Sequence, residues 1–229
     1  MNTKWFSVGC EGRTDLIMDK YTIGTASSSK TDRPSNKVDL AHPREAASRS
    51  LWIADDDETV VIPRETIHRC IIEAGKFFKY KGRKQFTTGD SSILPGIIEW
   101  GPDEAFVLDY PTWEVDVRGA RVASGQRQDK FRPIFPSWGF AFEVGIDADE
   151  IHPSVFRDIV DAAGRRVGIG SMRPERKGLY GQFRVVKWEE LDGPASTETP
   201  LRCKRLLESL LNKSGTAVAP AAASRKKAA

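Results

Sequence analysis

The chain has 229 residues, of which 39% are hydrophobic and 29% are charged, enough for one folded domain with insertions or a tail, and its net charge of +3 does not by itself demand a polyanionic partner. Three widely spaced cysteines, Cys10, Cys70 and Cys203, argue against a disulfide framework and a zinc site and favour a reducing, cytoplasmic setting. No run approaches the roughly 18 apolar residues of a membrane span, and no signal-peptide pattern occurs, so we expect no membrane association.

The first third of the sequence predicts a strand, an inserted segment and a helix. Aromatic and β-branched residues predict a strand over Thr3–Val8. Residues 22–36 change abruptly to Ser, Thr, Lys, Gly, Asp and Pro, which predicts a mobile excursion from the fold. After a short strand at Thr59–Ile62, a helix begins at Pro63 and ends before Gly82. Its apolar residues Ile67, Ile71, Ala74 and Phe78 recur at helical spacing.

The middle of the chain predicts short strands followed by a basic hairpin. Between Phe86 and Asp116, apolar pairs are broken by Pro and Gly, which is typical of short strands. The next segment, 118–132, has strand signals on both sides and predicts the tip of a long hairpin. It carries five basic residues against a single acid: Arg118, Arg121, Arg127, Lys130 and Arg132.

A second strand–helix–strand unit follows. Alternation predicts a strand over Gly139–Ile146, and helical spacing predicts a helix from about Pro153 to Gly164. A long loop rich in glycine and basic residues then leads to a final strand, Gln182–Trp188. The order strand, helix, strand, strand, helix, strand predicts an α+β, ferredoxin-like (modified RRM, βαββαβ) antiparallel sheet with both helices on one face. In that plan the other face is free for a ligand, as in RNA-recognition folds.

We divide the chain into three parts. Residues 1–190 form the domain, with insertions at 22–60 and 82–135. Residues 191–213 form a linker and a leucine-rich amphipathic helix, and residues 214–229 form a disordered basic tail.

The basic glycine loop and the basic hairpin are the candidate binding segments. Exposed backbone N–H groups among arginine and lysine are the chemistry that holds phosphates, and so long a connection is more often functional than idle. The loop residues singled out are Arg165, Arg166, Gly168, Gly170, Ser171, Arg173, Arg176, Lys177 and Tyr180. Alternatives stay open: the cations of both segments form a solvated rim, Gly168 and Gly170 only end the helix, and Tyr180 packs on the core instead of stacking on a base.

Three motifs, in chain order, carry a resemblance to a known family. They are Val8-x-Cys10-x-Gly12-x-Thr14-Asp15-Leu16-Ile17-Met18, Ile62-Pro63-x-x-x-Ile67-x-x-x-Ile71-x-Glu73-Ala74, and Gly168-Ile169-Gly170-Ser171-x-Arg173 with Gly178-x-Tyr180-Gly181-Gln182-Phe183-x-Val185. Together they resemble the first strand, first helix, glycine-rich loop and last strand of the RAMP superfamily, the RNA-binding proteins of CRISPR systems. The set is more similar still to uncharacterised phage and prophage proteins of this type.

The resemblance implies a fold that binds single-stranded RNA as a filament of repeated subunits. In the family, inserted loops lie between nucleotides, and 118–132 and 22–36 are the segments that could take this role. The chain departs from the family by its shorter length and by its extra leucine helix and basic tail.

We therefore expect a non-catalytic protein that binds single-stranded RNA, or single-stranded DNA, associates with itself or with related subunits, and needs no cofactor or metal. Two alternatives remain. The first is a metal-independent endoribonuclease, for which the candidate residues are His42, His68 and Tyr180, with Asp32 or Asp39 as an acidic loop residue. The second is a phage structural or interaction protein, in which Leu201–Leu211 packs on a neighbour. P-loop, HExxH and GxSxG motifs are absent from the sequence.

Overall fold

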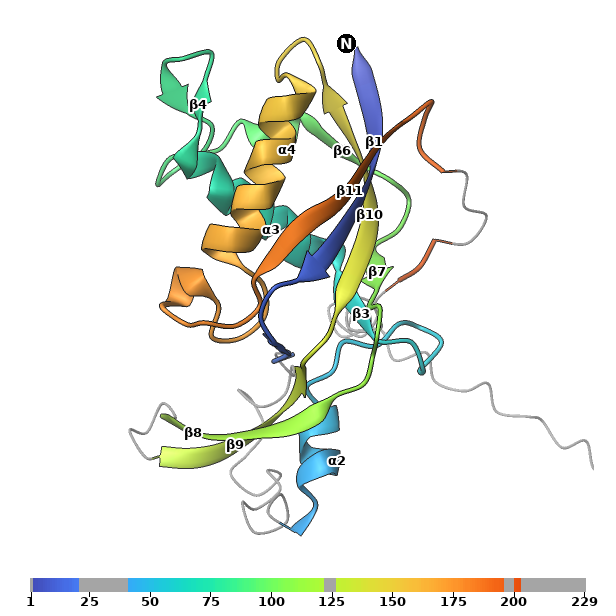
Figure 1. Ribbon diagram of the computed structural model, residues 1–229, viewed down its shortest axis with the longest axis vertical. Helices are drawn as coiled ribbons and strands as arrows, with labels where there is room; N and C mark the ends of the chain where they lie inside the picture. Colours follow the sequence, from blue (N-terminus) through green and yellow to red (C-terminus); the bar gives the residue numbers. More distant parts are fainter. Residues whose placement is uncertain (1, 21–40, 122–126, 196–199, 203–229) are drawn as a thin grey trace, which may run out of the picture.

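A four-stranded antiparallel sheet forms the body of the protein in the computed structural model, which describes residues 2–20, 41–121, 127–195 and 200–202. The strands follow the order β11-β1-β10-β6, and each neighbouring pair is antiparallel (Figure 1). They are β1 (Thr3–Gly12), β6 (Ile98–Trp100), β10 (Gly139–Asp147) and β11 (Phe183–Leu191). Because β6 pairs with β10, part of the stretch 82–135 belongs to the main sheet rather than to an insertion.

Two helices, both predicted from the spacing of apolar residues, cover one face of this sheet. They are α3 (Arg64–Ala74) and α4 (Pro153–Ala162), which pack against each other (Figure 1). Between helices and sheet lies a core whose large side chains are at most 3% exposed: Phe6, Val8, Ile67, Ile71, Phe140, Phe142, Phe156 and Ile159. Burial of each such side chain contributes about 1.5–3 kcal/mol, so this layer contact is the main source of stability.

Helix α3 is shorter than its sequence predicts. It ends at Ala74 and continues as a single 3₁₀ turn, η1 (Gly75–Phe77). The chain is closely packed at this point, since a Cβ atom at Gly75 would lie 2.5 Å from Thr87 Oγ1. The residues beyond form a small hairpin of β4 (Lys79–Tyr80) and β5 (Lys84–Gln85). Gly82, expected to end the helix, lies instead in the turn of that hairpin, with φ of +73°.

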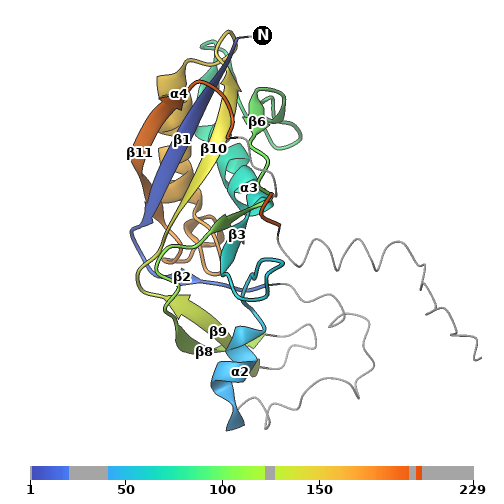
Figure 2. The same ribbon diagram turned by 90° about the vertical axis from the view of Figure 1, so that its right-hand side faces the viewer.

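A second layer lies at the end of the molecule away from the N-terminus (Figures 1 and 2). It contains the predicted basic hairpin, β8 (Glu114–Arg121) and β9 (Arg127–Phe135), with β2 (Leu16–Ile17) paired to β9. The short helix α2 (Pro43–Ser48) packs on the hairpin, with Ala46 and Ala47 against Phe131. A smaller pair, β3 (Val61–Pro63) and β7 (Ala105–Val107), joins the layers. None of the described helices is both long and apolar enough to span a membrane.

The described residues after β11 return to the body of the fold. The Ala195 amide donates to Glu143 Oε2 at 2.8 Å, and the Leu201 amide donates to Asp103 Oδ1 at 3.0 Å. The Glu104 amide donates in turn to the Leu201 carbonyl at 2.9 Å, and Leu201 packs against the core. The described residues after β11, expected to be linker up to Pro200 and helix from Leu201, therefore lie against the domain, and residues 201–202 are not helical. The predicted excursion 22–36, the leucine-rich segment beyond residue 202 and the basic tail lie outside the described residues.

Candidate nucleic-acid interface

The sheet face opposite the helices is not the free ligand surface expected from the sequence. Residues that pair across neighbouring strands point to the same face of the sheet. Ser7, Gly9, Glu11 and Gly145 lie on the face away from the helices. Together with their partners they place six charged side chains on that face. They are Glu11, Glu99, Glu143, Glu189, Arg184 and Lys187. Both bases are already paired, Arg184 with Glu11 at 2.7 Å and Lys187 with Glu189 at 2.8 Å. This acidic surface, contacted also by the chain's own Ala195, is a poor place for a polyanion.

The glycine loop packs on the protein's own backbone. The Ser171 amide donates to the Ile17 carbonyl at 2.8 Å, and the Gly181 amide donates to the Asp15 carbonyl at 2.8 Å. At Gly170, φ is +75° and a Cβ atom would lie 2.5 Å from the Ile17 oxygen. The expectation that these amides form a phosphate seat is therefore wrong for the amides that are used internally. Gly168 and Gly170 permit close backbone approach, but by the chain itself.

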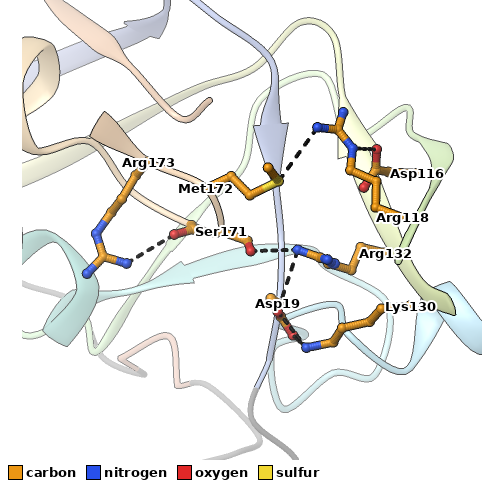
Figure 3. Close-up of polar contacts among 9 residues, drawn as sticks. Asp19, Asp116, Arg118, Lys130, Arg132, Ser171, Met172 and Arg173 are labelled. Atoms are coloured by element: carbon orange, nitrogen blue, oxygen red, sulfur yellow. Dashed lines mark hydrogen bonds and ion pairs between the residues drawn. The ribbon is translucent and has the colours of Figure 1, made fainter. Parts of the chain in front are cut away.

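The hairpin and the loop meet at Arg118 and Tyr180. The Arg118 Nη2 donates to Tyr180 Oη at 2.5 Å, and the guanidinium carbon lies 4.7 Å from the centre of the Tyr180 ring. The same guanidinium reaches Met172 Sδ at 3.6 Å and pairs through Nε with Asp116 Oδ1 at 2.6 Å (Figure 3). The hydrogen bond with Tyr180, and to a smaller extent the one with Asp116, raises the pKa of Arg118, so Arg118 remains a cation. Tyr180 is half-buried beside this arginine.

Two other hairpin cations are held by groups of the protein itself, Arg132 by the loop and by Asp19, and Lys130 by Asp19. Arg132 is only 6% exposed, and its Nη1 donates to Ser171 Oγ at 2.7 Å and lies 3.9 Å from Asp19 Oδ2. Lys130 Nζ lies 2.7 Å from both carboxylate oxygens of Asp19 (Figure 3). Arg132 and Ser171, both predicted to touch nucleic acid, are bonded to each other in this arrangement, and their contact with nucleic acid stays a prediction. Arg121 and Arg127 pair at the end of the hairpin, and their side chains lie outside the described part.

The remaining loop cations differ in how tightly they are held. Arg165 pairs with Asp161 at 2.9 Å, and Arg166 lies over the Phe77 ring. Arg173 is held by Glu175 at 2.6 Å and by the Gly170 carbonyl at 3.2 Å.

Arg176 and Lys177 are the loop cations most open to a ligand. The Arg176 side chain is 70% exposed, and its ion pair with Glu175 Oε2 is long, at 3.9 Å. Lys177 is exposed, with φ of +61°. Sequence reasoning missed a third such residue, Arg13, exposed beside the loop where its amide donates to Gln182 O at 2.7 Å. Arg13 is the only basic residue in the motif Val8–Met18, a signal that could have identified it.

A cleft of about 680 Å³ separates the glycine loop from α3. Arg69 and Glu73 of α3 line one wall, and Gly168–Ser171 with Arg173, Glu175 and Arg176 line the other. Arg69 is exposed and has no ion-pair partner among the residues that the structure describes. The cleft thus offers arginine side chains from two elements, together with carboxylates that limit how many phosphates it can hold.

The candidate catalytic residues His42, His68 and Tyr180 lie on separate elements, and Asp32 and Asp39 lie outside the described residues. The Trp100 Nε1 donates to His68 Nδ1 at 3.1 Å, which places the proton of neutral His68 on Nε2. Burial, followed by the charges of Arg64 and Arg69, lowers the pKa of His68. His42 is exposed at the start of α2, and the described contacts join neither histidine to Tyr180. No cluster of three or more His, Cys, Asp or Glu that could hold a metal occurs in the described ranges.

No protein-family model matches the sequence, and no curated protein matches it either. Several solved structures resemble the fold, among them the following two. The first is a chain of the type III-B Cmr-beta bound to cognate target RNA, at 15% identity and a TM-score of 0.49 over 82% of this chain and 61% of that one. The second is Cmr6 from Pyrococcus furiosus, at 11% identity and a TM-score of 0.41 over 81% of this chain and 99% of that one.

The chain spans less than two thirds of the length of the first neighbour.

Proposed function

We propose that the chain is a non-catalytic binding protein of the RAMP type for single-stranded nucleic acid, with RNA preferred to DNA. The proposal includes a ferredoxin-like domain, supported by the strand order β11-β1-β10-β6. In βαββαβ numbering this is the order four, one, three, two, with α3 and α4 as the two helices. The preference for RNA rests on the motif resemblance.

The single observation that supports this function most is the junction of hairpin and loop at Arg118 and Tyr180. An aromatic ring beside a guanidinium is a surface on which an unpaired base can stack, a contact worth about 1–3 kcal/mol per base. Arg13, Arg176 and Lys177 lie on the same loop or beside it, where they can pair with phosphates. Stacking and charge together suit a single strand, whose bases are exposed.

We also propose that binding is not accompanied by cleavage. A metal-independent ribonuclease needs a general base and a general acid near the 2′-hydroxyl. His68 uses Nδ1 to accept from Trp100, and Tyr180 is bound to Arg118, so neither is arranged as part of such a pair. Labelled RNA incubated with the protein in EDTA is expected to stay intact. Shortening that disappears in Tyr180→Phe would favour the ribonuclease instead.

Self-association along the strand is part of the proposal, since cooperative binding is usual for proteins that coat single strands. The expected result is binding in which the apparent affinity per protein rises with oligonucleotide length. Sedimentation of the protein with oligonucleotides of two lengths measures this. Binding of one protein molecule to the short oligonucleotide and also only one to the long oligonucleotide would contradict self-association.

Exchange of Arg176 and Lys177 together for alanine tests the binding surface. Each phosphate contact on a single strand contributes about 0.7 to the slope of log affinity against log salt, so the slope should fall by about 1.4 and the affinity should fall with it. The measurement is fluorescence anisotropy of a labelled oligonucleotide over a salt series.

A matched control removes the same charge from the acidic sheet face, by Arg184→Ala with Lys187→Ala. Both residues are exposed and paired with glutamates. We expect this control to keep most of the slope. Equal losses in the two variants would mean that only net charge matters, and the proposed surface would be wrong.

A further inference from the structure

An acid and a base lie opposite each other in the hairpin, and each has a buried atom without a partner. Asp116 of β8 and Arg132 of β9 are directly paired in the antiparallel ladder. They are 8% and 6% exposed. Among the described residues, Asp116 Oδ2 and Arg132 Nε have no hydrogen-bond partner, and no ion pair joins the two side chains. Opposite residues have Cα atoms about 4.5–5.5 Å apart and share a face, so a small rotation would join them.

Each side chain is instead held by a different neighbour. Asp116 Oδ1 accepts from Arg118 Nε at 2.6 Å, and Arg132 Nη1 donates to Ser171 Oγ at 2.7 Å (Figure 3). The other charged groups beside them are Asp19 and Lys130, which pair with each other at 2.7 Å. Asp19 is therefore largely engaged, and Arg132 lacks a close carboxylate, since its distance to Asp19 is 3.9 Å. A buried polar atom that lacks a hydrogen-bond partner is costly, and a bond between Asp116 Oδ2 and Arg132 Nε would remove that cost for both atoms.

We propose that Asp116 changes partner when a strand binds, from Arg118 to Arg132. This inference rests on the proposed function, because a phosphate of the strand is what takes Arg118. The side chain of Arg118 is about one third exposed, and its contact with Tyr180 places it where a nucleotide stacked on that ring carries its phosphate. Once Arg118 pairs with the phosphate, Asp116 turns to Arg132 Nε, and both unpartnered atoms are satisfied.

Asp116 and Arg132 are thereby positioning residues that touch no nucleotide. In the unbound protein, Asp116 keeps the charge of Arg118 compensated, which lowers its attraction for other anions. In the bound protein, Asp116 no longer pairs with Arg118, and its pair with Arg132 balances its negative charge instead. Affinity therefore depends on a buried residue that the strand cannot reach.

The direct test follows the arginine Nε–H signals of the full natural chain by ¹⁵N NMR while a single-stranded oligonucleotide is added. We expect the Arg132 Nε–H to shift and to exchange more slowly with solvent at saturation, as a new hydrogen bond requires. The Arg118 signal should shift as well. Binding that leaves Arg132 Nε–H unchanged would overturn the exchange and leave the proposed function standing. Absence of binding would overturn the proposed function, and the inference with it.

A double-mutant cycle gives a second test that a purely structural role cannot satisfy. Arg132→Gln removes the alternative partner of Asp116, so this single variant should bind the strand about fivefold or more weakly than the natural chain. The double variant, Arg132→Gln with Asp116→Asn, should bind within about twofold of the single variant Asp116→Asn. If Arg132 only holds the loop through Ser171, the second change gives no rescue, and that result overturns the inference.

Glu11→Gln is the matched control for the change in net charge, since Glu11 pairs with Arg184 on the acidic sheet face. Placed on the Arg132→Gln background, it should give no rescue. Equal rescue by Glu11→Gln would also overturn the inference. Should Arg132→Gln fail to fold, the NMR titration of the natural chain decides alone.

Discussion

Arg173 and Arg176 lie three positions apart in the glycine loop, and their contacts decide which of them is free to bind a ligand. Arg173 is held by Glu175 and by the Gly170 carbonyl, whereas the Arg176 side chain is 70% exposed. The sequence presents both as basic loop residues, and nothing in their neighbours along the chain separates them. The difference arises because η4 (Pro174–Arg176) turns Glu175 back onto Arg173.

The first prediction follows from this difference. Arg173→Ala should lower the free energy of unfolding more than it lowers strand affinity, because it removes contacts within the loop. Arg176→Ala should do the opposite. Urea denaturation and fluorescence anisotropy of the two variants measure both quantities. Equal effects on affinity, with no change in stability, would show that Arg173 is as open to the strand as Arg176.

Tyr180 carries the second prediction. Tyr180→Ala should weaken binding by roughly 1–3 kcal/mol, the range for one stacked base, with little change in the salt dependence. Tyr180→Phe keeps the ring and should retain most of the affinity. Anisotropy titrations at several salt concentrations separate stacking from charge. A Tyr180→Phe variant as weak as Tyr180→Ala would place the contribution in the hydroxyl and its bond to Arg118 instead.

His68 gives a pH dependence of stability whose sign is defined. Burial, helped by Arg64 and Arg69, lowers the pKa of His68 below its ordinary value of about 6.5. Between the folded and unfolded pKa values, the unfolded chain binds more protons. The contribution of His68 to stability is therefore complete above about pH 6.5 and is lost as the pH falls towards the folded pKa.

Thermal melts from pH 7.5 to 5.5 test this third prediction. The decrease in Tm on acidification should be smaller in His68→Gln than in the natural chain, since glutamine does not titrate. His42→Gln makes the same exchange at an exposed histidine and is the matched control. A natural profile in His68→Gln would mean that other groups cause the decrease.

At the scale of elements, the periodic segments were predictable and the glycine loop was not. Helices α3 and α4 and strands β1, β10 and β11 follow from the spacing of side chains that become buried, such as Ile67 and Phe156. Glycine composition indicates positive φ and close approach, but it does not say which backbone approaches. In the folded chain the approaching atoms belong to Ile17, whose partnership with Ser171 depends on a tertiary contact more than 150 residues away.

Two glycines with similar dihedral angles separate these effects in a fourth prediction. Gly82 (φ +73°) has open space around its Cβ position, whereas a Cβ at Gly170 (φ +75°) would lie 2.5 Å from the Ile17 oxygen. Gly82→Ala should cost about 1–2 kcal/mol from its left-handed conformation. Gly170→Ala should cost about 1–3 kcal/mol more, because the loop must move off β2. Urea denaturation measures both; equal costs would show that the loop adapts freely.

At the scale of the whole molecule, charge is divided unevenly along the chain. Six of the 35 Lys and Arg residues, but one of the 32 Asp and Glu residues, follow Arg202. The first 202 residues therefore carry a net charge of −2, and the last 27 carry +5. Net attraction for a polyanion thus depends on local surfaces and on the C-terminal segment rather than on the charge of the domain.

The fifth prediction concerns that segment. Exchange of Arg225, Lys226 and Lys227 for glutamine should lower the salt slope of binding while leaving the preference for single strands over duplexes unchanged, because stacking at Tyr180 is retained. Competition titrations with duplex and single-stranded oligonucleotides measure both properties. Loss of the preference would assign strand discrimination to the C-terminal segment.

The return of the chain after β11 bears on where the protein can be cut. Leu201 is partly buried in the core and is bonded to Asp103 and Glu104, which directly precede β7. Shortened versions made for crystallisation should therefore end after residue 202 rather than at the end of the last strand. A version stopped at 190 would leave the Glu104 amide and an apolar patch open to solvent, and its reduced solubility would be misread as a failure of the proposed nucleic-acid surface.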